Sequence, residues 1–131
     1  MEDRQLTDAL AVSPQIRPRD MPEIRRRGYR AIVCNRPDGE ADDQPAFDAV
    51  AAAARAEGLE VRYMPVTSGE IDDAKAARFG ATLAELPGPV LAYCRSGLRS
   101  ATLWARDAAR TRSGHDVEER LRRAGHGGAR G

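Results

Sequence analysis

The chain has 131 residues, of which 41% are hydrophobic and 31% are charged, and its formal net charge is +1. This length accommodates one domain with one core, and the composition is typical of a folded globular protein rather than a disordered one. A charge this close to zero creates no global field that would attract nucleic acid or an anionic membrane, so we expect neither as a partner.

The sequence also argues against a membrane segment, a leader and a metal site. It has no run of about 18 apolar residues and no charged-then-apolar start, so we expect a cytoplasmic protein. Cys34 and Cys94 lie sixty positions apart, and His115 and His126 fall near the end, which is not the spacing of a zinc site. We therefore predict no metal and no cofactor, and we expect neither histidine to pair with Cys94.

Strand and helix patterns alternate along the chain. Apolar runs predict strands, and alanine-rich or amphipathic stretches that end in glycine predict helices. In chain order the predicted elements are a flexible start (1–9), an edge strand (10–16), a helix (17–28), a strand (29–34), a helix (45–58), a strand (59–66), a helix (70–86), a buried central strand (88–93), helices at 100–109 and 116–125, and a frayed tail (126–131). This order predicts an α/β domain over 10–125, with a mainly parallel central sheet flanked by helices.

The segment "CRSGLRS" follows the most apolar predicted strand and precedes a helix. Ligands of parallel sheets bind at the carboxyl ends of strands, and a helix amino terminus there stabilises an anion. Cys94 beside Arg99 is therefore predicted to form a reactive thiolate, and these two are the candidate catalytic residues. The predicted anion-binding loop comprises Arg95, Ser96, Gly97, Leu98 and Ser100, in which Gly97 permits a tight turn and Ser100 donates a hydrogen bond to the sulfur.

This loop resembles those of rhodanese-like sulfurtransferases and of cysteine-dependent phosphatases. Together with "NRPDGE" and "VRYMPVTSGEID", the sequence resembles the phosphatase-like domain of β-lactamase-hydrolase-like proteins. The resemblance covers roughly 10–125 and implies a dual-specificity-phosphatase-like fold. Relatives that are fused to sulfide-oxidising enzymes imply such an enzyme as a partner.

Loop length separates the two activities that the resemblance implies. The phosphatase signature has five residues between cysteine and arginine, whereas four lie between Cys94 and Arg99, as in rhodaneses. The shorter loop favours a sulfurtransferase that carries sulfur as a Cys94 persulfide, with a small sulfur-containing anion as donor and a thiol as acceptor.

Two other functions remain open at this point. A phosphatase acting through a Cys94 phosphoenzyme would need a general acid, for which Glu70, Asp72 and Asp73 are candidates. Asp72 and Asp73 also fit the first turn of a helix. Alternatively, the domain is a persulfide carrier or regulatory module for a sulfide-oxidising partner.

The remaining candidate site residues lie at the end of the predicted strand at 29–34 and just after it. Arg36 and Asp38 either bind substrate or form an ion pair within their turn. Cys34 is either a buried structural residue or a resolving thiol that forms a disulfide with Cys94.

Overall fold

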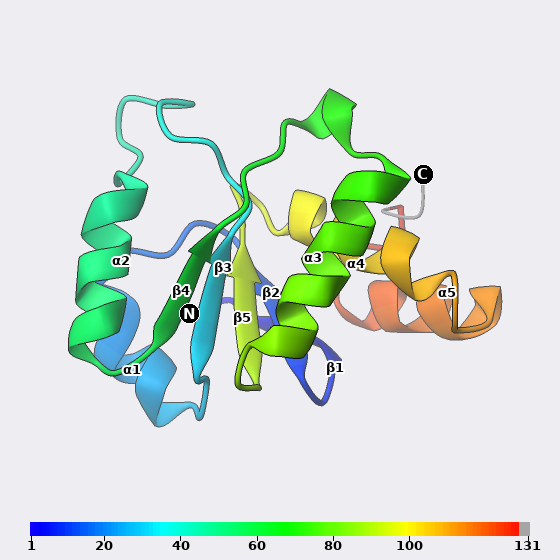
Figure 1. The fold of residues 1–131 in the computed structure, drawn as a ribbon, viewed down its shortest axis with the longest axis horizontal. Helices are drawn as coiled ribbons and strands as arrows, with labels where there is room; N and C mark the ends of the chain where they lie inside the picture. The colour runs from blue at the N-terminus through cyan, green and yellow to red at the C-terminus, as the bar shows by residue number, and fades with distance from the viewer. Residues whose placement is uncertain (129–131) are drawn as a thin grey trace.

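The computed structural model describes residues 1–128 and contains one five-stranded sheet between two layers of helices (Figure 1). The strands are β1 (Arg4–Thr7), β2 (Leu10–Ser13), β3 (Ala31–Cys34), β4 (Glu60–Tyr63) and β5 (Val90–Tyr93). Their spatial order is β1-β2-β5-β3-β4, and only the β1–β2 pair is antiparallel. The mainly parallel α/β fold predicted from the sequence is confirmed.

Five helices and two short 3-10 turns cover this sheet. They are η1 (Pro18–Asp20), α1 (Met21–Arg26), α2 (Phe47–Ala56), η2 (Ser68–Glu70), α3 (Asp73–Glu85), α4 (Leu98–Ala108) and α5 (Gly114–Arg123). Figure 1 shows α1 and α2 on one side of the sheet and α3, α4 and α5 on the other.

Side-chain alternation along the strands divides the core between these two layers. Val33 and Ala92 face the cluster formed with α3, α4 and α5, whereas Ile32 and Leu91 face the cluster formed with α1 and α2. All four of these side chains are fully buried, as a strand covered on both faces requires. Because β5 lies between β2 and β3, the chain leaves the middle of the sheet at Cys94.

The start of the chain differs from the sequence-based prediction. Residues 4–7 form the edge strand β1 rather than a flexible segment, and β2 therefore lies inside the sheet. An edge strand with one solvated face needs few apolar residues, and here only Leu6 is buried, so the polar sequence concealed the strand.

The end of the chain also differs. The backbone N–H of His126 donates to the Leu121 carbonyl at 2.8 Å, and Gly125 adopts φ +80°, which closes the carboxyl end of α5. His126 is therefore held in place rather than frayed. The last three residues of the predicted tail, 129–131, lie outside the described residues.

Several helices begin a few residues away from their predicted starts, and one of these differences affects the site. The predicted helix at 17–28 begins as the 3-10 turn η1, and α3 begins only at Asp73. Helix α4 begins at Leu98 rather than at residue 100, so Arg99 belongs to its first turn. In residues 1–128, no helix is long and apolar enough to cross a membrane.

Candidate active site

Cys94 lies at the carboxyl end of β5, against the amino terminus of α4. Its side chain is buried, and its sulfur accepts a hydrogen bond from the backbone N–H of Gly97 at 3.1 Å. Gly97 has φ +94°, a backbone conformation that residues other than glycine rarely adopt. Helix α4 starts at the next residue. The turn thus places a backbone donor and a helix amino terminus at the sulfur, and both stabilise a thiolate.

The exposed part of the loop consists of Arg95, Ser96 and Leu98. The Arg95 carbonyl accepts a hydrogen bond from the backbone N–H of Gln15 at 3.3 Å, and the Ser96 hydroxyl accepts one from Leu98 at 3.3 Å. These bonds fix the loop backbone and leave the Arg95 side chain at the surface.

Arg99 is held by a carboxylate that the sequence analysis did not select. Its two terminal nitrogens donate to the two carboxylate oxygens of Glu40 at 2.7 and 2.8 Å, and one of them also donates to the Val66 carbonyl at 3.0 Å. Hydrogen bonding to Glu40 raises the pKa of Arg99, and the neighbouring charge of Cys94 contributes to this rise. The guanidinium therefore lies next to the nucleophile with a fixed orientation.

Glu40 also binds Arg36. The Arg36 Nε donates to Glu40 at 3.0 Å, and its Nη1 donates to the side chain of Gln15 at 2.9 Å. Hydrogen bonds from Arg99, and then from Arg36, lower the pKa of Glu40 to about 2. Gln15, Arg36, Glu40 and Arg99 thus form one network beside Cys94.

Asp38 is not part of this network. Its carboxylate accepts a hydrogen bond from the backbone N–H of Phe47, the first residue of α2, at 2.8 Å, and its own N–H donates to the Tyr63 hydroxyl at 3.0 Å. Of the two alternatives for Arg36 and Asp38, the ion pair between them is not formed, because Glu40, two residues after Asp38, binds the guanidinium of Arg36.

The Ser100 hydroxyl was predicted to donate to the Cys94 sulfur, but it donates to Asn35 instead. Its hydroxyl donates to the side-chain oxygen of Asn35 at 2.8 Å, and the Asn35 amide donates to the Met64 carbonyl at 3.0 Å. Both Asn35 and Ser100 are completely buried. Ser100 lies on the face of α4 that packs against the end of β3, and it therefore connects these elements instead of contacting substrate.

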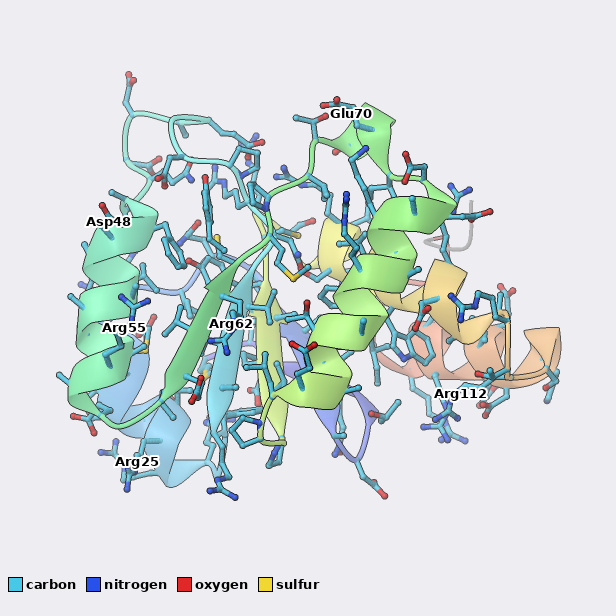
Figure 2. All side chains as sticks on the ribbon, viewed as in Figure 1. Arg25, Asp48, Arg55, Arg62, Glu70 and Arg112 are labelled. Carbon is cyan, nitrogen blue, oxygen red and sulfur yellow. The ribbon has the colours of Figure 1, made fainter. Side chains whose placement is uncertain are left out.

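The three candidate acids lie in the connection between β4 and α3. Asp72 caps α3 by accepting the backbone N–H of Lys75 at 2.8 Å, and Asp73 forms an ion pair with Arg106 at 3.2 Å. Glu70 accepts a hydrogen bond from Thr67, and Figure 2 shows it at the outer end of this connection, exposed. In this structure none of the three makes a hydrogen bond to the Cys94 loop.

Cys34 and Cys94 are both buried, and both are free thiols with no disulfide between them. Cys34 pairs in register with Tyr93, and both belong to the cluster under α1 and α2. Burial is the main cause that raises the pKa of Cys34, and its thiol donates to the Arg36 carbonyl at 3.2 Å. This placement matches a structural cysteine and does not bring the two sulfurs together for a disulfide.

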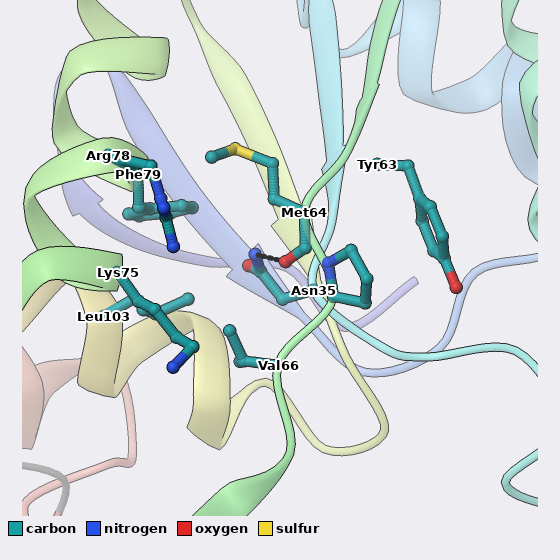
Figure 3. Close-up of a pocket in the computed structure, with 9 residues that line it drawn as sticks. Asn35, Tyr63, Met64, Val66, Lys75, Arg78, Phe79 and Leu103 are labelled. Atoms are coloured by element: carbon teal, nitrogen blue, oxygen red, sulfur yellow. Dashed lines mark hydrogen bonds between the residues drawn. The ribbon is translucent and has the colours of Figure 1, made fainter. Parts of the chain in front are cut away.

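A pocket of about 270 Å³ opens beside this network, between the end of β4, α3 and α4 (Figure 3). Its walls include the apolar side chains of Met64, Phe79 and Leu103, and Figure 3 shows Lys75 and Arg78 reaching into it from α3. Val66 and Asn35 line the pocket and also accept hydrogen bonds from Arg99 and Ser100. The pocket is thus connected to the Cys94 loop through two hydrogen bonds.

Sequence reasoning missed Gln15, Asn35 and Glu40. A signal existed for two of them, because "NRPDGE" begins with Asn35 and ends with Glu40. Gln15 lies in a segment whose pattern indicates nothing about the site. Within residues 1–128, no group of three His, Cys, Asp or Glu side chains is placed to hold a metal ion.

Comparison with known proteins identifies the family of the chain. Residues 2–111 match the family described as the phosphatase-like domain of beta-lactamase hydrolase-like proteins. A beta-lactamase hydrolase-like protein of Xylella fastidiosa is 40% identical over 100 residues, which is 76% of this chain and 23% of that protein. The chain therefore spans about a quarter of the length of the curated relatives that it matches.

Solved structures share the fold. A candidate phosphatase from Neisseria meningitidis superimposes with a TM-score of 0.87 at 33% identity, covering 95% of this chain and 89% of the other. Kinase-associated phosphatase, with its catalytic cysteine replaced by serine, gives 0.72 at 17% identity, covering 98% and 84%, and shows the fold alone. Because the family model covers residues 2–111 and a curated relative is 40% identical over 76% of the chain, the chain belongs to the family of phosphatase-like domains of beta-lactamase hydrolase-like proteins.

Proposed function

We propose that this domain is a sulfurtransferase in which Cys94 carries sulfur as a persulfide. The observation that carries the proposal is the loop itself, in which four residues separate Cys94 from an Arg99 that is already bound by Glu40. A loop of this length encloses less space than the five-residue phosphatase loop. A single sulfur atom needs fewer donors than a phosphoryl group with three oxygens.

The chemistry takes place in two displacements. The Cys94 thiolate attacks the outer sulfur of a donor such as thiosulfate, a Cys94 S–S bond forms, and sulfite leaves with the electron pair of the broken bond. An acceptor thiolate or cyanide then attacks the outer sulfur and releases Cys94 as a thiolate. The Gly97 N–H, 3.1 Å from the sulfur, and the Arg99 charge stabilise the anionic sulfur in each step.

The positions of the acidic residues support sulfur over phosphate. Sulfite leaves as a stable anion and needs no proton, whereas the alkoxide released from a phosphate ester does. Asp72 is engaged in capping α3, Asp73 in an ion pair with Arg106, and Glu70 is exposed. A sulfurtransferase requires none of them to move.

A phosphatase is the second candidate, and the comparisons favour it. The family is described as phosphatase-like, and the Neisseria structure is named as a candidate phosphatase. In that case Cys94 would form a phosphoenzyme, and Glu70, Asp72 or Asp73 would protonate the leaving group after a rearrangement of the β4–α3 connection.

A third candidate is a sulfur carrier that works with a partner protein. It is suggested by the length of the relatives, since the match covers only 23% of the Xylella protein. The domain would then accept sulfur on Cys94 stoichiometrically and pass it to a sulfide-oxidising partner. A carrier gives one product per protein, whereas an enzyme gives many with a small acceptor.

One experiment separates the three candidates. Turnover is measured with thiosulfate and cyanide, and separately with para-nitrophenyl phosphate, for the native protein and for Cys94→Ser. We expect multiple turnovers to thiocyanate that Cys94→Ser abolishes, and no phosphate release. Phosphate release without thiocyanate would identify a phosphatase, and a single turnover would identify a carrier; either result overturns the proposal.

A further inference from the structure

A second hollow adjoins the Cys94 loop on the side of β1 and α5. It has a volume of about 440 Å³ and is lined by residues from the start of the chain, from the loop and from the end of α5. We call it the β1–α5 groove. The residues that matter for its chemistry are Glu2, Arg4, Arg95, Ser96 and His126.

Charge in the β1–α5 groove is mostly positive. Arg4 and Arg95 both line it, and within residues 1–128 neither forms an ion pair with a carboxylate. Glu2 is the carboxylate that lines the same groove. Two guanidinium groups facing one cavity form a site for carboxylates, because each offers a planar pair of donors. Glu2 adds an acceptor for an ammonium group.

His126 gives the groove a fixed polar wall. The end of α5 holds its backbone through the hydrogen bond to Leu121. Burial, and then the charge of Arg4, lower the pKa of His126, which favours the neutral form of the ring. A neutral imidazole presents one donor and one acceptor to a ligand without repelling the two arginines.

The loop of Arg95, Ser96 and Gly97 lies between the β1–α5 groove and Cys94. Arg95 and Ser96 follow Cys94 directly and line the groove. The N–H of Gly97 faces the Cys94 sulfur, while a Cβ on the other side of Gly97 would lie 3.1 Å from Nε2 of His126. A ligand in the groove is therefore separated from Cys94 by the loop, of which Ser96 is an exposed residue.

We propose that the β1–α5 groove binds the acceptor of the transferred sulfur, and that this acceptor is a small thiol derived from an amino acid, with carboxylate and ammonium groups. Arg4 and Arg95 bind its carboxylates, Glu2 its ammonium group, and the thiol extends over Ser96 to Cys94. The part of this inference that concerns the acceptor rests on the proposed sulfurtransferase function.

In the proposed step, the outer sulfur of the Cys94 persulfide is transferred to the acceptor thiol. The acceptor thiolate attacks the outer sulfur of the Cys94 persulfide, a new S–S bond forms on the acceptor, and the Cys94 S–S bond breaks. Cys94 leaves with the electron pair as a thiolate, and no external oxidant or reductant is consumed.

The first test uses glutathione, which carries two carboxylates and one ammonium group, against cyanide, which carries neither. The variants are Arg4→Glu and the matched control Arg55→Glu, an exposed arginine of α2 on the opposite layer (Figure 2). We expect Arg4→Glu to raise the ratio of the KM for glutathione to the KM for cyanide by about tenfold or more, and Arg55→Glu to leave this ratio unchanged. Equal ratios in both variants would overturn the groove assignment while the sulfurtransferase stands.

The second test does not depend on turnover. S-methylglutathione, which has no free thiol, is titrated into isotope-labelled protein, and backbone amide shifts are followed by NMR. We expect shifts at Ser96, Gly97 and His126 and at least tenfold weaker binding to Arg4→Glu. Saturable shifts in a protein without sulfur transfer would retain the groove as a carboxylate site and refute only the proposed function. No shifts, or equal affinity in both variants, would refute the groove.

Discussion

At the scale of single residues, Glu40 and Val66 take up part of the hydrogen-bonding capacity of Arg99. Three of the five N–H groups of a guanidinium are used by Glu40 and the Val66 carbonyl. Two remain for a ligand next to Cys94. Since each bond to Glu40 also restricts rotation of the guanidinium, Glu40 sets the direction in which Arg99 presents these two donors.

Replacing Glu40 tests this dependence. We expect Glu40→Gln to lower the free energy of unfolding at pH 7 by about 1–2 kcal/mol, because its hydrogen bonds with Arg36 and Arg99 lose their charge while partial exposure screens them. The pKa of Glu40 is about 2, below the ordinary 4.5, so its stabilisation is complete above pH 4.5 and is lost as the pH falls toward 2. Urea unfolding at pH 7 and pH 3 measures the difference.

The matched control is Glu60→Gln, which breaks the exposed ion pair with Arg62. We expect it to change the urea midpoint very little at either pH. A difference between Glu40→Gln and the native protein that is as large at pH 3 as at pH 7 would contradict the assignment of the low pKa to Glu40.

At the scale of elements, the contact between α3 and α4 depends on a residue that is poor for helices. Gly80 lies in the middle of α3, and a Cβ there would collide with the carboxylate of Asp107 on α4. Sequence propensity alone counts this glycine as a weakness of the predicted helix. The structure shows instead that it permits close approach, and α4 is the helix that carries Arg99.

Gly80→Ala therefore sets helix propensity against packing. Alanine favours the helix by about 1 kcal/mol, whereas a forced contact costs about 1–3 kcal/mol. We expect Gly80→Ala to lower the free energy of unfolding in the native background and to raise it in an Asp107→Ala background, where the obstacle is gone. Urea denaturation of the four proteins measures both changes, and stabilisation in the native background would disprove the steric argument.

At the scale of the whole molecule, the order of elements was predictable and the long-range polar contacts were not. The apolar run before Cys94 predicts a central strand because only a strand covered on both faces tolerates such a sequence. Glu40 and Arg99 are fifty-nine positions apart, and no local sequence pattern predicts the ion pair between them. The strand at residues 4–7 was missed for the same reason, since its place is fixed by β2 and α5 rather than by its own sequence.

Removing that strand measures what it contributes. Leu6 is buried, and its carbonyl accepts a hydrogen bond from Arg120 of α5 at 2.8 Å, so β1 connects the sheet to the helix that positions His126. We expect Leu6→Ala to cost about 2–4 kcal/mol and Gln5→Ala, on the exposed face of the same strand, much less. Deletion of residues 1–8 should lower the urea midpoint at least as far as Leu6→Ala, because it also exposes the edge of β2. If the deletion left the midpoint unchanged, β1 would add nothing to the fold, and the groove that includes Arg4 would lose its support.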